Sequence, residues 1–149
     1  MIKKIQIGTT NLNVAPINLG GNVFGWTLDE KKSFEILDAF VDHGFNFIDT
    51  ADVYADGLSE EVVGVAIGSD RENWIVASKV GFRSPTTSSD VKLNNTYIRK
   101  NLEGTLQRLD TDFLDLYYLH ADDPNTPPTE TLATVAELMD ENLIKGFGL

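Results

Sequence analysis

The sequence has 149 residues, of which 42% are hydrophobic, and its formal net charge is −11. This length and apolar content suit a single globular domain with a buried core. Bulk electrostatic repulsion opposes the binding of so acidic a chain to nucleic acid or to anionic membranes, and we expect neither as a partner. The absence of cysteine excludes disulfides, thiolate nucleophiles and thiolate metal ligands. The default expectation is a cytoplasmic protein with no metal.

The first 22 residues predict a hairpin followed by a short strand. Apolar residues in 5–7 and 12–14 flank a turn at 8–11 that is rich in glycine, threonine and asparagine. Residues 16–19 then predict a strand that ends in the small residues of 20–22, where the backbone can approach a ligand closely. No apolar stretch in the sequence reaches the roughly 18 residues that a membrane span needs, and the N-terminus lacks the apolar run of a signal peptide.

Beyond residue 22, strand patterns alternate with helical patterns. The apolar spacing predicts helices at 28–43, 59–68, 98–109 and 131–139, strands at 45–49, 74–80 and 113–119, and the start of a further strand at 145–149. Together with the strand at 16–19, these segments make four units of a strand followed by a helix and the start of a fifth. An eight-unit barrel typically needs ~250 residues, so they amount to about half of one. We therefore predict an α/β fold of the (β/α)8 TIM-barrel class, with residues 1–149 forming the N-terminal half of a barrel domain behind a β-hairpin.

Two helix starts carry specific expectations. Thr27 and Glu30 have the spacing of a capping box at the first helix. Ser59 is expected to cap the second helix, whose first turn contains Glu60 and Glu61. Negative charge is favourable at this position, so we interpret the two glutamates as helix-start charges and not as an acid/base pair.

Four reactive side chains follow or end the predicted strands. They are Asp49, Tyr54, Lys79 and His120. Because the carboxyl ends of parallel strands lie at one edge of a sheet, we expect these side chains to cluster. A tyrosine with a pKa near 10 is a weak acid, and a neighbouring ammonium such as Lys79 would favour its phenolate.

The remaining two groups fit the same chemistry. Asp49 could hold the ammonium in place, and neutral His120 could donate a hydrogen bond to a substrate oxygen on which negative charge develops. A hydride donor must come from a cofactor, because no side chain supplies one.

Three segments closely resemble the signature of the aldo-keto reductase family. They are the run Phe47-Ile48-Asp49-Thr50-Ala51-Asp52-Val53-Tyr54 with Ser59-Glu60 and Gly64 after it, the run Ala77-Ser78-Lys79, and the run Asp115-Leu116-Tyr117-Tyr118-Leu119-His120. The loop 120–127 resembles the branch that includes bacterial reductases and potassium-channel β subunits. The resemblance implies a (β/α)8 barrel that reduces aldehydes and ketones with NADPH, or less often NADH.

The resemblance also implies roles for individual residues. Tyr54 is expected to be the general acid, supported by Lys79 and Asp49, while His120 orients the carbonyl. The turn 19–25 resembles the segment that lies along the nicotinamide. Residues expected at the cofactor are Gly21, Asn22, Val23 and Asp49, and those expected at the substrate wall are Phe24, Trp26 and Phe82.

Three functional hypotheses follow. The first is a carbonyl oxidoreductase of the aldo-keto reductase type. The second is a catalytically incompetent half-barrel that serves as an assembly or folding unit, because the family's cofactor-binding Ser-Asn pair and later loops lie beyond the position of Leu149; such a half-barrel would expose sheet edges and invite self-association. The third is a Schiff-base lyase using Lys79, which we rank last because Asp49 should keep that amine protonated.

Overall fold

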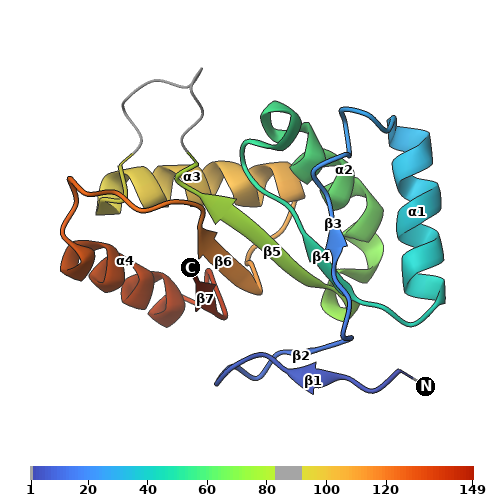
Figure 1. Cartoon of the computed structure of the whole chain (residues 1–149), viewed down its shortest axis with the longest axis horizontal. Helices are drawn as coiled ribbons and strands as arrows, with labels where there is room; N and C mark the ends of the chain where they lie inside the picture. Colours follow the sequence, from blue (N-terminus) through green and yellow to red (C-terminus); the bar gives the residue numbers. More distant parts are fainter. Residues whose placement is uncertain (1, 83–91) are drawn as a thin grey trace.

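The computed structural model describes residues 2–82 and 92–149. In chain order its elements are β1 (Ile5–Gln6), β2 (Asn13–Val14), β3 (Leu19–Gly20), α1 (Glu30–Asp42), β4 (Phe47–Asp49), α2 (Leu58–Ile67), β5 (Ile75–Val80), α3 (Asn95–Leu109), β6 (Leu116–Leu119), α4 (Pro128–Asp140) and β7 (Phe147–Gly148), with 3-10 segments at Tyr54–Gly57 and Gly68–Asn73. Strands β3 to β7 form a parallel sheet in sequence order, and β1 and β2 form an antiparallel hairpin (Figure 1). The predicted hairpin and the predicted alternation of strand and helix are therefore confirmed.

The two faces of the sheet bury different clusters. Ile48 and Val76 belong to the main core, which lies between the sheet and the helices. Ala77 and Leu116 point the other way and pack with Leu12 of the hairpin in a second, smaller cluster. The hairpin thus closes one end of the face that the helices leave open (Figure 1).

Helices α2 and α3 pack with their backbones almost in contact. A Cβ atom at Gly64 would lie 2.8 Å from the backbone oxygens of Arg108 and Leu109, so only glycine fits there. The buried face of α3 includes Ile98, Leu102 and Leu109, as its apolar spacing predicts. This close contact places the end of α3 against the second half of α2.

The predicted caps of the first two helices are wrong. Helix α1 begins at Glu30, and its cap is the carboxylate of Asp29, which accepts a hydrogen bond of 2.8 Å from the backbone nitrogen of Lys32. Gly57 occupies the cap position of α2, and Ser59 is the second residue of the helix. The Ser59 hydroxyl instead contacts Gly21 and Thr50, which directly follow β3 and β4, so buried long-range partners have replaced the local one.

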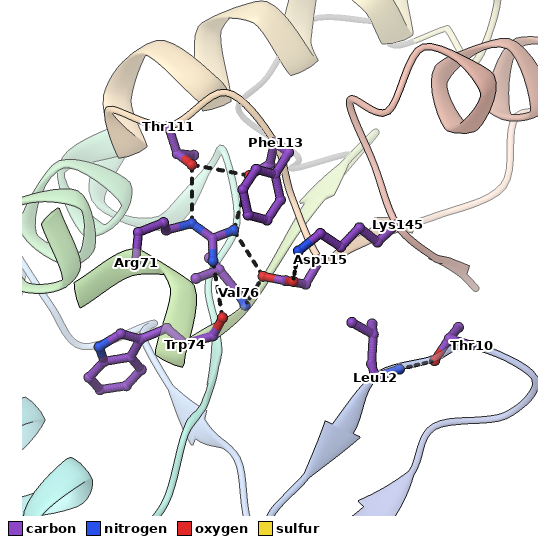
Figure 2. A network of polar contacts seen from close by, with 9 residues as sticks. All are labelled: Thr10, Leu12, Arg71, Trp74, Val76, Thr111, Phe113, Asp115 and Lys145. Carbon is purple, nitrogen blue, oxygen red and sulfur yellow. Dashed lines mark hydrogen bonds and ion pairs between the residues drawn. The ribbon is translucent and has the colours of Figure 1, made fainter. Parts of the chain in front are cut away.

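At the amino ends of the strands, Asp115 joins three segments (Figure 2). Its side chain is 1% exposed. One carboxylate oxygen accepts hydrogen bonds from Arg71 (2.9 Å) and from the backbone nitrogen of Val76 (3.0 Å), and the other accepts from Lys145 at 3.1 Å. Both cations also lie over the ring of Phe113. Asp115 therefore ties the starts of β5, β6 and β7 together.

Candidate active site

The four predicted side chains come together at the carboxyl ends of the strands. Asp49 ends β4, Lys79 lies near the end of β5, and His120 directly follows β6. Tyr54 begins the 3-10 segment after β4. The Lys79 ammonium lies 2.8 Å from Asp49 Oδ1 and 3.3 Å from the Tyr54 hydroxyl. The clustering expected from the sequence is confirmed.

The terminal nitrogen of Lys79 contacts three oxygens. Besides Asp49 and Tyr54, its ammonium donates a hydrogen bond of 2.7 Å to the carbonyl oxygen of Thr50. Only 14% of its side chain is exposed. An ammonium bound to a carboxylate and two further oxygens is not nucleophilic, which is the physical argument against Schiff-base chemistry at this residue.

His120 is surrounded by aromatic rings. It lies edge-on to Tyr54 with 6.0 Å between the ring centroids, and 4.8 Å from the ring of Phe82. Burial, and then the positive charge of Lys79, lower the pKa of His120 below its usual value, against the opposing effect of Asp49. Its Nδ1 is buried without a hydrogen-bond partner among the described residues. The imidazole is therefore neutral at physiological pH.

The turn after β3 is held mainly by contacts within the chain. The Gly21 amide donates to Asp49 O at 2.7 Å, and the Gly21 carbonyl accepts from Ser59 Oγ at 2.7 Å. A Cβ atom at Gly21 would lie 3.0 Å from that hydroxyl, so the glycine is needed for packing. Val23 is half-buried, and the exposed side chain of this turn is that of Asn22.

The three aromatic residues expected at the substrate wall have different surroundings. Phe24 is 0% exposed and lies in the main core, so the expectation that it contacts substrate is wrong. The chain folds back between Val23 and Leu28, joined by a 3.0 Å backbone hydrogen bond, and this turn sends the Phe24 ring inward. Trp26 is 74% exposed in the same turn, and Phe82 is 39% exposed. Phe82 is the one in ring contact with His120.

A groove of about 730 Å³ extends from His120. It is lined by Leu119, Phe147, Leu132 and the proline-rich loop 121–128. Within residues 2–82 and 92–149, no group of three or more histidine, aspartate or glutamate side chains is suited to hold a metal ion, and no helix is both long and apolar enough to cross a membrane.

Sequence reasoning missed the buried acids behind the site. Glu60 lies in the first turn of α2 as expected, but it is 0% exposed and therefore not a solvated helix-start charge. It shares its helix face with Val63 and Ile67, which are also fully buried, and this spacing was the available signal. Burial, and then the negative charge of Glu60, raise the pKa of nearby Asp52 to about 6.

Comparisons with known proteins show to which family the chain is similar. The sequence pattern of the aldo/keto reductase family matches residues 16–149. A probable voltage-gated potassium channel subunit beta from Arabidopsis thaliana is 35% identical over 140 residues, which is 91% of this chain and 42% of that protein.

Solved structures give the same result. The holo form of an aldo-keto reductase from Bacillus halodurans matches with a TM-score of 0.89 at 35% sequence identity. The match covers 99% of this chain and 50% of that reductase. An aldo-keto reductase from Klebsiella pneumoniae in complex with NADPH has a TM-score of 0.83 at 33% identity, covering 99% of this chain and 49% of its own.

The chain thus spans about half the length of the relatives it matches. Its parallel βα units match part of their folds, which confirms the predicted fold class and the resemblance to bacterial reductases and potassium-channel β subunits. On the family pattern, the sequence identity and the structural match together, this chain belongs to the aldo/keto reductase family.

Proposed function

We propose that the chain carries the catalytic tetrad of an NAD(P)H-dependent oxidoreductase that reduces the carbonyl group of an aldehyde or ketone. The observation that carries this proposal is the Lys79 ammonium held between Asp49 and the Tyr54 hydroxyl, at 2.8 Å and 3.3 Å. The NADPH complex of the related Klebsiella reductase supports the choice of cofactor, with NADH as the less favoured donor. A small carbonyl compound is the substrate class, and we place the reaction in the cytoplasm.

Tyr54 is the proton donor in this proposal. A nicotinamide cofactor, when bound, would supply the hydride to the carbonyl carbon. The Tyr54 hydroxyl gives its proton to the carbonyl oxygen, so that the product is an alcohol. The phenolate left on Tyr54 is stabilised by the positive charge of Lys79. Asp49 keeps that ammonium in position and charged.

His120 acts as a hydrogen-bond donor to the same oxygen. A neutral imidazole can donate without competing with Tyr54 as the acid, and the lowered pKa of His120 keeps it in that form. Phe82, in contact with the imidazole, forms one side of the substrate site. Trp26 is exposed on a nearby turn and is a second candidate for substrate contact.

The turn after β3 offers some of the groups that a nicotinamide cofactor would contact. Asn22 exposes a polar side chain directly after Gly21, whose amide is bonded to the backbone of Asp49. Asn22 and Asp49 are therefore the groups that would face the nicotinamide end. Gly21 and Val23 act by holding the turn in shape, because their backbone groups bond within the chain.

The test is Tyr54→Phe in an active reductase that contains these 149 residues. We expect carbonyl reduction to fall by roughly 10²–10⁴-fold with NADPH binding retained, because the variant loses the proton donor and keeps the ring. Tyr97→Phe, on α3 outside the tetrad, is the matched control. Retained turnover in Tyr54→Phe would reject Tyr54 as the acid, and borohydride trapping of substrate on Lys79 would favour the Schiff-base alternative.

A further inference from the structure

A single buried carboxylate joins three elements behind the active site. Glu60 of α2 is 0% exposed. Its Oε1 accepts a hydrogen bond of 2.5 Å from Ser78 Oγ on β5, and its Oε2 accepts one of 2.6 Å from Arg108 Nε on α3. One oxygen of Glu60 is therefore bonded to β5 and the other to α3.

Ser78 immediately precedes Lys79 on β5, so the two side chains point to opposite faces of the strand. Glu60 contacts the strand from the helix side, while Lys79 extends toward Asp49 and Tyr54 on the other side. Rotation or sliding of β5 that displaced the Lys79 ammonium would also have to break the short Ser78–Glu60 hydrogen bond.

Backbone contacts hold this end of β5 more firmly on the β6 side than on the β4 side. Residues 77–80 pair with 116–119 of β6, and the His120 amide donates to the Val80 carbonyl at 2.7 Å. On the β4 side the contacts are looser. The Lys79 carbonyl accepts from the Asp52 amide at 3.4 Å, which is a long hydrogen bond. The bond between the Thr50 amide and the Ala77 carbonyl is shorter, at 2.9 Å, but it lies two residues earlier on β5. The Ser78–Glu60 bond, at 2.5 Å, therefore restrains this end of the strand from the helix side.

The burial of a charged side chain at residue 60 costs desolvation energy. A buried ion pair costs desolvation energy on both partners, and well-packed apolar residues often serve as well. Glu60 also lies close enough to Asp52 to raise the pKa of that acid further, after the larger effect of burial. A carboxylate at residue 60 therefore carries an energetic cost that a purely structural contact would not require.

We propose that Glu60 is a positioning residue that, through Ser78, fixes where β5 delivers the Lys79 ammonium between Asp49 and Tyr54. The proposal rests on the proposed function, in which that ammonium stabilises the phenolate of Tyr54. Glu60 itself touches neither substrate nor cofactor in this scheme.

The test measures Lys79 directly and needs no turnover. The folded 149-residue chain is treated with a trace of acetic anhydride at fixed pH, and the acetylation rate of Lys79 is compared with that of exposed Lys31 by mass spectrometry. In Glu60→Gln we expect the relative rate at Lys79 to rise roughly threefold, the size of effect expected when one charge-assisted hydrogen bond is weakened. Asp49→Asn, which removes a direct partner of the ammonium, is the positive control.

Two further variants make the result specific. Glu61→Gln changes the same chemistry one residue away, at an exposed position, and should leave the Lys79 rate unchanged. Ser78→Ala removes one end of the hydrogen bond while leaving the Glu60–Arg108 pair, and should raise the rate in the same direction. If Glu60→Gln does not fold, Ser78→Ala serves as the test variant.

Thermal unfolding of each variant is measured in parallel. An unchanged Lys79 rate in folded Glu60→Gln and Ser78→Ala would overturn the proposal, and a lowered melting temperature alone would show only a structural role. A raised Lys79 rate combined with full turnover in Tyr54→Phe would keep the positioning role and reject the proposed function, so the two failures are distinguishable.

Discussion

At the scale of single residues, the surroundings of His120 determine its protonation state. We expect its imidazole to titrate below 6.5 in an NMR pH titration, since burial is the largest cause of its lowered pKa. Phe82→Ala should move the midpoint up toward 6.5 by admitting water to the ring. Phe45→Ala, at a ring that stacks on Phe40 in another part of the chain, is the control. A midpoint at or above 6.5 in the unmodified protein would contradict a neutral hydrogen-bond donor.

The sign of the linked stability effect follows from that shift. A histidine whose pKa is lower in the folded state binds fewer protons there than in the unfolded state. His120 therefore reduces the free energy of unfolding as pH falls below about 6.5, toward its folded-state pKa.

Asp52 gives the opposite pH dependence. Its pKa rises from 3.8 to about 6, so the folded state binds more protons between these values and stability falls as pH increases through them. We expect Asp52→Asn to raise the free energy of unfolding above pH 6 by up to about 3 kcal/mol, measured by urea denaturation, and to have little effect near pH 4. Asp56→Asn, at an exposed position in the same segment, should change neither value. Equal stability of Asp52→Asn and the unmodified protein at pH 8 would show that Asp52 is not strained by burial.

At the scale of elements, the network around Asp115 connects the starts of β5, β6 and β7 (Figure 2). Asp115→Ala leaves the guanidinium of Arg71, 11% exposed, without its carboxylate partner. We expect a loss of about 3 kcal/mol in the free energy of unfolding, because breaking a buried pair leaves an uncompensated charge.

Two variants calibrate that measurement. Asp112→Ala, at an exposed position three residues earlier, should change stability by less than about 0.5 kcal/mol. Lys145→Ala should cost less than about 1 kcal/mol, because the Lys145 side chain is 46% exposed and its ion pair is screened by water. A loss in Asp115→Ala no larger than in Lys145→Ala would show that the pair with Arg71 contributes little.

At the scale of the whole molecule, the parallel sheet has two edge strands, β3 and β7. Unpaired edge strands and exposed apolar side chains favour association, and Leu132 and Leu149 are exposed beside the groove near β7. We expect residues 1–149 alone to self-associate, as measured by light scattering.

The same chain should show no detectable NADPH oxidation with a good aldehyde substrate. Fixing the nicotinamide against the carbonyl can contribute roughly 7–11 kcal/mol to lowering the barrier, and this chain spans about half the length of its reductase relatives. A monodisperse monomer with saturable turnover that Tyr54→Phe abolishes would contradict both expectations.

The sequence by itself determined the order of the elements and predicted which four side chains lie together at one edge of the sheet. Strand periodicity of two and helix periodicity of 3.6 are local properties, and they predicted the hairpin, the βα units and the edge at which Asp49, Lys79 and His120 gather. These predictions succeeded because the carboxyl ends of parallel strands share one edge of a sheet whatever the details of packing. Helix starts were less predictable, since Asp29 and Thr27 are both suitable caps by residue type.

Only the tertiary structure decided which side chains face one another across elements. Ser59 and Glu60 both looked like features of a helix start, yet packing of α2 against the sheet and against α3 turned them to Gly21, Ser78 and Arg108. Phe24 looked like a ligand contact, yet the fold of its turn buried it in the core. The physical reason is the same in each case: a residue's type and spacing define the face it occupies, but its partner is set by how distant elements pack on that face.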